Sequence, residues 1–239
     1  MANKVILVTG ASKGIGKAIA ERLSPFHKLA LFARTEPALI ELKENLETKG
    51  GEVLVIVGDV TQEDDVKRAV EETIGHYGTI DVLVNNAGIG LFNRVDQFSL
   101  EDFKHVMDIN MTGAFLFTKY VSPTLIGNKS GQIINIASVA GLTGFKTGSA
   151  YAASKFALVG FTESVREDLK EFGIAVTAVC PGGVRTGFGG GDPNKAGRDY
   201  LLEPEDVART VEYLVNESET ANTKLVELKP RRREHARGT

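Results

Sequence analysis

The chain has 239 residues, of which 42% are hydrophobic and 25% are charged, so it is long enough for one large globular domain. A net charge of −3 gives no general attraction for nucleic acid or for an acidic membrane, and neither is expected as a partner. The single cysteine, Cys180, excludes an intrachain disulfide and fits a cytoplasmic location, and the four histidines show no metal-ligand spacing. The first apolar run, Val5–Val8, is too short for a signal peptide or a membrane span.

Short apolar runs rich in β-branched residues alternate with longer helical patterns along the chain. The predicted strands are Lys4–Thr9, Lys28–Ala33, Glu52–Val57, Val82–Asn85, Gln132–Ala137, Ile174–Val179 and Thr223–Leu228. The predicted helices are Ile15–Leu23, Pro37–Lys49, Gln62–Tyr77, Leu100–Leu125, Ala150–Phe172 and Pro204–Asn216. The strand runs are continuously apolar, as in strands that are buried on both faces.

This alternation predicts one α/β domain of the Rossmann type, with a doubly wound parallel sheet of about seven strands and helices on both faces. We expect the domain to cover residues 1–228 and a basic tail to cover residues 229–239. Thr61 is expected to cap the third helix and Gly173 to end the fifth. The glycine-rich stretch Gly182–Gly197 is the clearest irregular segment, and its composition suits either a mobile lid or plain disorder.

A glycine-rich turn lies between the first predicted strand and the first predicted helix. It reads Thr9-Gly-Ala-Ser-Lys-Gly-Ile-Gly16, with the spacing G-x-x-x-G-x-G rather than G-x-G-x-x-G. Glycines let a backbone approach a phosphate closely, and the N-terminus of a helix supplies N–H donors and positive potential. A turn of this kind can be purely structural, but its place in a doubly wound pattern favours dinucleotide binding.

Tyr151 and Lys155 lie four residues apart in a predicted helix, so their side chains share one face, and Ser138 lies thirteen residues upstream. A free phenol has a pKa near ~10, and a neighbouring ammonium group lowers that pKa. A shift of about 3 units needs about 4 kcal/mol, which a close charge in a poorly solvated site can supply. The pair therefore predicts a proton donor and acceptor for carbonyl–alcohol chemistry, although an amphipathic tyrosine beside a snorkelling lysine has the same pattern.

The glycine turn and the Tyr–Lys pair together resemble the classical short-chain dehydrogenase/reductase family, over roughly residues 4–190. Further matches in the same order are Asp59-Val60, Asn85-Asn-Ala-Gly88, and Pro181-Gly182 followed by Thr186. The predicted cofactor-binding set is Gly10, Ser12, Lys13, Gly14, Ile15, Gly16, Arg34, Asp59, Val60, Asn86, Ala87, Gly88, Tyr151, Lys155, Pro181, Gly182, Val184 and Thr186.

The resemblance also implies four catalytic residues. Tyr151 would protonate the substrate oxygen as hydride arrives from the nicotinamide, and Ser138 would hydrogen-bond the same oxygen. Lys155 would hold the ribose hydroxyls and lower the pKa of the phenol. Asn110 would organise a water that relays protons towards Lys155, and its alternative role is that of a buried amide tying the helix backbone to its neighbours.

The residues after the second predicted strand bear on the choice of cofactor. NAD-binding domains of this type place an acid there, which accepts from the ribose 2′-hydroxyl. Here Ala33 stands at that place, Arg34 follows it, and Lys13 is within reach in the glycine turn, which suits a 2′-phosphate. Glu36 is nearly at the right distance for an NAD acid, but before Pro37 at a helix start it complements the helix dipole. NADP(H) is therefore favoured over NAD(H).

The substrate is less well defined than the reaction. Family position suggests a largely apolar pocket that draws on Ile89, Leu91, Phe92, Val139, Leu142, Phe145, Phe188 and Tyr200. The C-terminal run Thr223–Arg233 lacks the Asp-Gly-Gly signature of many 3-oxoacyl-carrier-protein reductases and is more similar to the sepiapterin-reductase-like and carbonyl-reductase branch.

The sequence thus predicts an NADP(H)-dependent oxidoreductase that interconverts a ketone or aldehyde and an alcohol. It is expected to be a homodimer or homotetramer with no metal. The leading alternative is a 3-oxoacyl-[acyl-carrier-protein] reductase, and a remote one is a dinucleotide sensor without catalysis. Epimerase or dehydratase chemistry on sugar nucleotides is disfavoured because the length leaves no separate substrate domain.

Overall fold

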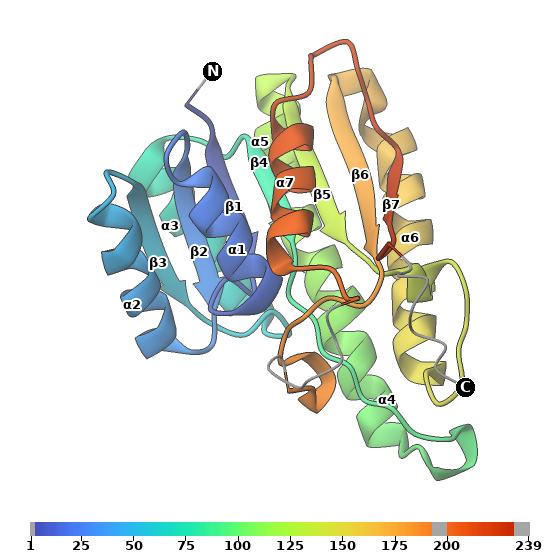
Figure 1. Cartoon of the computed structure of the whole chain (residues 1–239). Helices are drawn as coiled ribbons and strands as arrows, with labels where there is room; N and C mark the ends of the chain where they lie inside the picture. The colour runs from blue at the N-terminus through green and yellow to red at the C-terminus, as the bar shows by residue number, and fades with distance from the viewer. Residues whose placement is uncertain (1–2, 193–199, 232–239) are drawn as a thin grey trace.

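A seven-stranded parallel sheet forms the centre of the computed structural model, which describes residues 3–192 and 200–231 (Figure 1). The strands are β1 (Val5–Thr9), β2 (Lys28–Ala33), β3 (Glu52–Val57), β4 (Val82–Asn85), β5 (Gly131–Ile136), β6 (Ile174–Pro181) and β7 (Leu225–Leu228). Their order in the sheet is β3-β2-β1-β4-β5-β6-β7, and every neighbouring pair is parallel. The predicted fold class is confirmed.

Helices cover both faces of the sheet (Figure 1). They are α1 (Gly14–Leu23), α2 (Glu36–Glu47), α3 (Glu63–Tyr77), α4 (Leu100–Met107), α5 (Gly113–Asn128), α6 (Ser149–Leu169) and α7 (Pro204–Val215). Helices α1, α2 and α7 pack on one face and α3, α5 and α6 on the other. Successive strand residues point to opposite faces, so in β1 Ile6 and Val8 join the first layer and Leu7 joins the second. Both layers are apolar, which explains the continuously apolar strand runs.

The prediction of one continuous helix over Leu100–Leu125 is wrong, because the helix is interrupted. The chain forms α4, then a wide π-helical turn over Asp108–Thr112, and then α5, which runs on to Asn128. The N–H of Gly113 donates to the carbonyl of Asp108, five residues back, so the turn holds one more residue than an α-helical turn. This turn buries the side chain of Asn110.

The two predicted helix ends have different outcomes. Thr61 does not cap α3, because its N–H and hydroxyl both donate to Oδ1 of Asp59, each at 2.9 Å, and the capping position is Gln62. The hydroxyl of Thr61 is hydrogen-bonded to the carboxylate of Asp59, two residues upstream, instead of to the backbone at the start of the helix. Gly173 does end the helical segment after α6, with φ of 73° in the left-handed region.

The sheet brings the predicted site residues to one edge. Successive crossovers run from β1 to β2 and β3 in one direction and from β4 to β7 in the other, so β1 and β4 adjoin the switch point. Ligands of doubly wound sheets bind outside the carboxyl ends of the strands at such a point. The segments that follow β1, β4, β5 and β6 carry most of the predicted residues, and Figure 1 shows these strand ends at the lower edge.

Part of the predicted glycine-rich stretch and most of the predicted tail, residues 193–199 and 232–239, lie outside the described residues. No helix in the described part of the chain is long and apolar enough to cross a membrane.

Candidate active site

The turn between β1 and α1 has no room for side chains at two of its glycines. A Cβ on Gly16 would lie 2.3 Å from the carbonyl oxygen of Gly10. Gly10 itself has a φ of 65°, and a Cβ there would lie 2.8 Å from Cα of Ala87. The turn is therefore pressed against the segment after β4, with the first turn of α1 directly behind it. The predicted role of the turn in phosphate binding requires such a close approach of backbone at the N-terminus of a helix.

Thr9 and Asn86 hold this turn in place. The hydroxyl of Thr9 accepts from the N–H groups of Asn86 and Ala87, at 3.0 and 3.1 Å. Nδ2 of Asn86 donates to the carbonyls of Thr9 and Gly10, at 2.9 and 3.1 Å. Asn86, predicted to bind the cofactor, thus lies behind the glycine turn and shapes it. Thr9 was not predicted, although a hydroxyl at the last residue of a buried strand is a signal that could have singled it out.

The segment after β6 spans from the predicted catalytic residues to the glycine turn. The hydroxyl of Ser138 donates to the carbonyl of Pro181 at 3.4 Å, and the N–H of Gly182 donates to that of Leu228 at 2.7 Å. Farther along, Cγ2 of Thr186 lies 3.3 Å from where a Cβ of Gly14 would stand. Thr186 therefore lies close to Gly14 at the start of α1.

The predicted cationic residues for the 2′ position lie at the exposed rim of the sheet edge. Nη1 of Arg34 is 3.7 Å from Oδ2 of Asp59, and 61% of the Arg34 side chain is exposed. Ala33 is buried, so no carboxylate occupies the end of β2. Lys13 is exposed, and Glu36 lies in the first turn of α2, as its proposed role towards the helix dipole requires.

Lys155 is buried at the centre of the predicted catalytic group, with 4% of its surface exposed. Its Nζ donates to the carbonyl of Ile136 at the end of β5, at 2.9 Å, and lies 5.9 Å from the ring centroid of Tyr151. A Cβ on Gly88 would lie 3.6 Å from this Nζ and 3.2 Å from Oδ1 of Asn110. Residues from α6, the π-helical turn and the segment after β4 therefore meet at one point.

The amide of Asn110 is tied to its surroundings by three hydrogen bonds. Nδ2 donates to the carbonyl of Ile89 and to Oγ of Ser154, both at 2.9 Å, and Oδ1 accepts from the N–H of Ile89 at 2.8 Å. Ser154, which was not predicted, in turn donates to the carbonyl of Tyr151 at 2.7 Å. Both amide hydrogens are engaged, so the side chain has the tying role that the sequence allowed, and a part in a proton relay stays a prediction.

Burial shifts the pKa values of Lys155 and Tyr151 in the directions that favour their neutral forms. It lowers the pKa of Lys155 from 10.5 to about 8, against a smaller opposing effect of the nearby Cys180. It also raises the pKa of Tyr151, with an opposing contribution from the Ser138 side chain. The expectation that Lys155 lowers the pKa of Tyr151 is therefore wrong for this structure. The reason is that burial of the phenol itself has the largest effect on its pKa and disfavours the charged form.

The pKa of Lys155 predicts how stability changes with pH in the cofactor-free protein. Between pH about 8 and 10.5 the unfolded lysine binds more protons than the folded one, so stability rises with pH in this window. Relative to Lys155→Met, the wild-type free energy of unfolding should rise by about 2–3 kcal/mol from about pH 7 to about pH 10. Urea unfolding of both proteins measures this difference. A difference that stays constant with pH would show that Lys155 is not desolvated.

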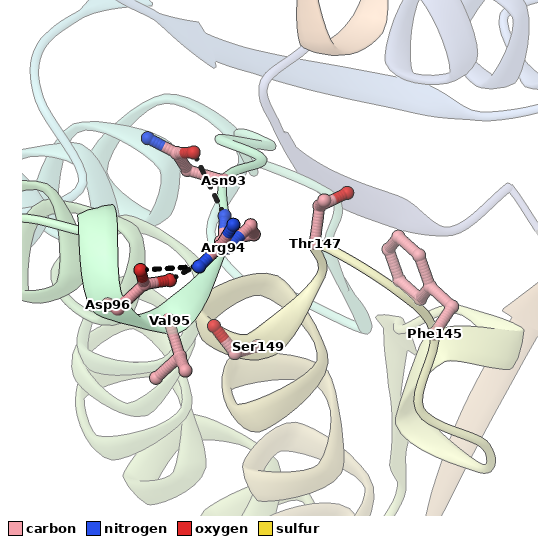
Figure 2. A pocket seen from close by; sticks show the side chains of 7 residues that line it. All are labelled: Asn93, Arg94, Val95, Asp96, Phe145, Thr147 and Ser149. Carbon is pink, nitrogen blue, oxygen red and sulfur yellow. Dashed lines mark hydrogen bonds and ion pairs between the residues drawn. The ribbon is translucent and has the colours of Figure 1, made fainter.

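Three phenylalanine rings lie next to Tyr151, and one of them also lines a cavity. Phe92, Phe145 and Phe188, all among the predicted pocket residues, have ring centroids 5.7, 6.5 and 5.5 Å from that of Tyr151. Phe145 also borders a cavity of about 450 Å³, shown in Figure 2 and lined by Asn93, Arg94, Val95, Asp96, Phe145, Thr147 and Ser149. The other predicted pocket residues differ: Ile89 and Leu142 pack against the core, and Tyr200 is about half exposed.

Comparison with known proteins places these features in a family. Residues 4–195 match the family model described as short chain dehydrogenase. A 3-oxoacyl-[acyl-carrier-protein] reductase of Synechocystis sp. is 36% identical over 229 residues, 91% of each chain. An uncharacterized oxidoreductase of Thermotoga maritima is 39% identical over 180 residues, 75% of this chain and 71% of the relative.

Solved structures agree with this placement. An alcohol dehydrogenase from the archaeon Thermococcus sibiricus, complexed with 5-hydroxy-NADP, superposes with a TM-score of 0.91 at 28% identity, covering 98% of this chain and all of the other. Levodione reductase and a variant of actinorhodin polyketide ketoreductase with NADPH both give 0.88 at 30% identity, over 95% of this chain and 96% of theirs. The chain therefore belongs to the short-chain dehydrogenase family, whose members are oxidoreductases acting on the CH–OH/C=O pair.

Proposed function

We propose that the protein is an NADP(H)-dependent oxidoreductase that interconverts a ketone or aldehyde and an alcohol, with Tyr151 as the proton donor and acceptor. One observation carries this proposal. Tyr151, Ser138 and Lys155 converge at the carboxyl edge of the sheet, next to a glycine turn that excludes side chains. A phenol, a hydroxyl and an ammonium group beside a phosphate cradle are the groups that hydride transfer to a carbonyl needs.

The glycine turn and the segment after β6 fit a dinucleotide. The turn with Gly10 and Gly16 would hold the pyrophosphate, and Thr186, which faces Gly14, would close over it. Arg34 and Lys13 would bind a 2′-phosphate, because charge-assisted hydrogen bonds to phosphate are strong. The solved relatives that contain NADPH or 5-hydroxy-NADP support this cofactor. When bound, the nicotinamide supplies or accepts the hydride.

The protein's own residues would handle the proton and the substrate oxygen. Ser138 would donate a hydrogen bond to the carbonyl oxygen, and the phenol of Tyr151 would give it a proton. A phenol is protonated at neutral pH at its ordinary pKa, and the upward shift in Tyr151 leaves it so, as reduction requires. Lys155 would hold the ribose, and Asn110, fixed by Ile89 and Ser154, would keep the π-helical turn beside it.

A screen of ketones and aldehydes with NADPH tests the proposal. We expect a substrate-dependent loss of the absorbance of the reduced nicotinamide and formation of the matching alcohol. If the protein binds NADPH but reduces no carbonyl compound across a broad panel, the proposed reaction is wrong and the dinucleotide sensor becomes the better account.

Replacing Arg34 by Ala should lower the preference for NADPH over NADH. A charge-assisted hydrogen bond contributes about 1.5–3 kcal/mol, so the ratio of the two kcat/KM values should fall about 10- to 100-fold. The matched control is Arg209→Ala, since that side chain is 62% exposed on α7 and pairs with Glu205. A wild-type preference for NADH, or an unchanged ratio in Arg34→Ala, would contradict the assignment of NADP(H).

A second candidate is the reduction of a 3-oxoacyl thioester. The 36% identity to a 3-oxoacyl-[acyl-carrier-protein] reductase favours it. The C-terminal run that follows β7 argues against it, because Lys229-Pro-Arg lacks the signature glycines. Turnover of a 3-oxoacyl thioester far above that of simple ketones would decide for this candidate, and comparable or lower turnover would decide against it.

A further inference from the structure

Three phenylalanine rings from three different segments enclose the phenol of Tyr151. Phe92 follows β4, Phe145 follows β5 and Phe188 follows β6, and we call these three residues the aromatic cage. Their planes make angles of 74°, 71° and 58° with that of Tyr151, so no ring of the cage stacks parallel on it. Each cage residue is 43–48% exposed. Exposed clusters of apolar side chains are found at sites that bind ligands, proteins or membranes, and the contact of these rings with Tyr151 favours a ligand here.

Glycines in the same segments leave space that the rings occupy. A Cβ on Gly90 would be 2.7 Å from the ring of Phe92, and one on Gly189 would be 2.6 Å from the same ring. A Cβ on Gly148 would be 2.3 Å from the ring of Phe145. The rings thus pack directly on backbone, in spaces that any other residue would fill. The glycines and the rings of the aromatic cage therefore fit together in this structure.

The cavity beside the cage offers space for a larger molecule and carries little net charge. Its volume of about 450 Å³ lies in the range of small-molecule pockets, and Phe145 belongs both to its lining and to the cage (Figure 2). The N–H of Asn93 donates to the carbonyl of Thr147 at 3.0 Å, which joins the two segments that line it. Arg94 is paired with Asp96 through two contacts of 3.0 and 2.7 Å, so its charge is balanced within the wall.

We propose that the substrate is an uncharged ketone, or the matching alcohol, that carries an aromatic ring a few bonds from the carbonyl carbon. With the oxygen at Tyr151 and Ser138, such a ring would lie within the aromatic cage, and the rest of the molecule would extend into the cavity. Edge-to-face and offset-stacked aromatic pairs contribute binding energy beyond that of apolar area, which an aliphatic group of equal size lacks. This inference rests on the proposed function.

Two ketones that differ only in the ring test the inference. Benzylacetone and its cyclohexyl counterpart have the same methyl ketone, separated from the ring by two methylene groups, so their carbonyls are equally reactive. We expect kcat/KM of the wild-type protein to be about tenfold higher for benzylacetone. In Phe92→Leu, Phe145→Leu and Phe188→Leu, which keep an apolar side chain, this preference should fall to about twofold or less.

Phe26→Leu is the matched control. Phe26 is 50% exposed but lies just before β2, at the amino end of the strands and therefore away from the site. The control should keep the tenfold preference. Equal kcat/KM for the two ketones in the wild-type protein, or a preference that survives in all three cage variants, overturns the inference.

The same measurements separate this inference from the proposed function. If kcat/KM for the cyclohexyl ketone equals or exceeds that for benzylacetone, the oxidoreductase assignment stands and the aromatic substrate class is wrong. If no carbonyl compound is reduced by NADPH in the presence of the protein, the proposed function is wrong, and the substrate class falls with it.

Discussion

Tyr151→Phe should lower kcat for carbonyl reduction by about 10²- to 10⁴-fold, the usual contribution of a positioned general acid. The change removes only the phenolic oxygen, so the ring contacts with the aromatic cage remain. Because the hydroxyl acts on the substrate oxygen, the affinity for NADPH should change by less than about threefold. Initial rates of NADPH oxidation and a fluorescence titration of NADPH measure the two effects separately.

Tyr213→Phe provides the control for this loss. Tyr213 is 63% exposed near the end of α7, which lies beside the start of β1 at the opposite edge of the sheet, and the same chemical change there should leave kcat unaltered. Activity near the wild-type level in Tyr151→Phe would mean that another group delivers the proton. An equal loss of NADPH binding would instead assign the phenol to cofactor binding.

Gly16→Ala should abolish dinucleotide binding and destabilise the fold. The new Cβ would lie 2.3 Å from the carbonyl of Gly10 and 2.6 Å from Nδ2 of Asn86, so the turn or the segment after β4 must move. Overpacking of this kind costs about 1–3 kcal/mol of stability. We expect the Kd for NADPH to rise at least about 100-fold, because the shift displaces the N–H groups that hold the phosphates. Titration with NADPH and urea unfolding give both quantities.

Gly160→Ala is the matched substitution within α6. A Cβ there would have nothing within 4 Å, and Ala is favoured over Gly in a helix by about 0.5–1 kcal/mol. This variant should therefore bind NADPH as the wild-type protein does and be at least as stable. Wild-type affinity for NADPH in Gly16→Ala would contradict the assignment of the turn to the cofactor.

The fold could be predicted because the strands and the helices have different hydrophobic patterns in the sequence. Strands such as β2 and β4 are buried on both faces and read as apolar runs, and their predicted ends match the observed ones. The break between α4 and α5 has no corresponding change in the hydrophobic pattern. Residues 100–125 have an unbroken helical pattern, and the π-helical turn becomes visible only when Gly113 bonds to Asp108. Its effect, the burial of Asn110 beside Ser154, depends on tertiary packing.

The sequence pattern could predict that several of the candidate site residues lie together, but it could not predict their pKa values. Spacing places Tyr151 and Lys155 on one helical face, and the structure brings Tyr151 next to Ser138 and Lys155 to 5.9 Å from the Tyr151 ring centroid. The direction of the Tyr151 pKa was wrong, because desolvation depends on everything packed around the phenol and cannot be read from spacing. The rings of the aromatic cage were predicted as pocket residues one by one. Their convergence on Tyr151 needed the positions of three separate segments.

Transfer of deuterium to a substrate tests the central claim most directly. NADPH carrying two deuterium atoms at the reactive carbon of its nicotinamide ring, so that either face delivers the label, is incubated with the protein and with benzylacetone, its cyclohexyl counterpart and a 3-oxoacyl thioester. The account predicts an alcohol with one deuterium on the former carbonyl carbon, formed by the wild-type protein and almost not at all by Tyr151→Phe. Bound NADPH without any deuterated alcohol from the wild-type protein, or equal labelling by Tyr151→Phe, would contradict it.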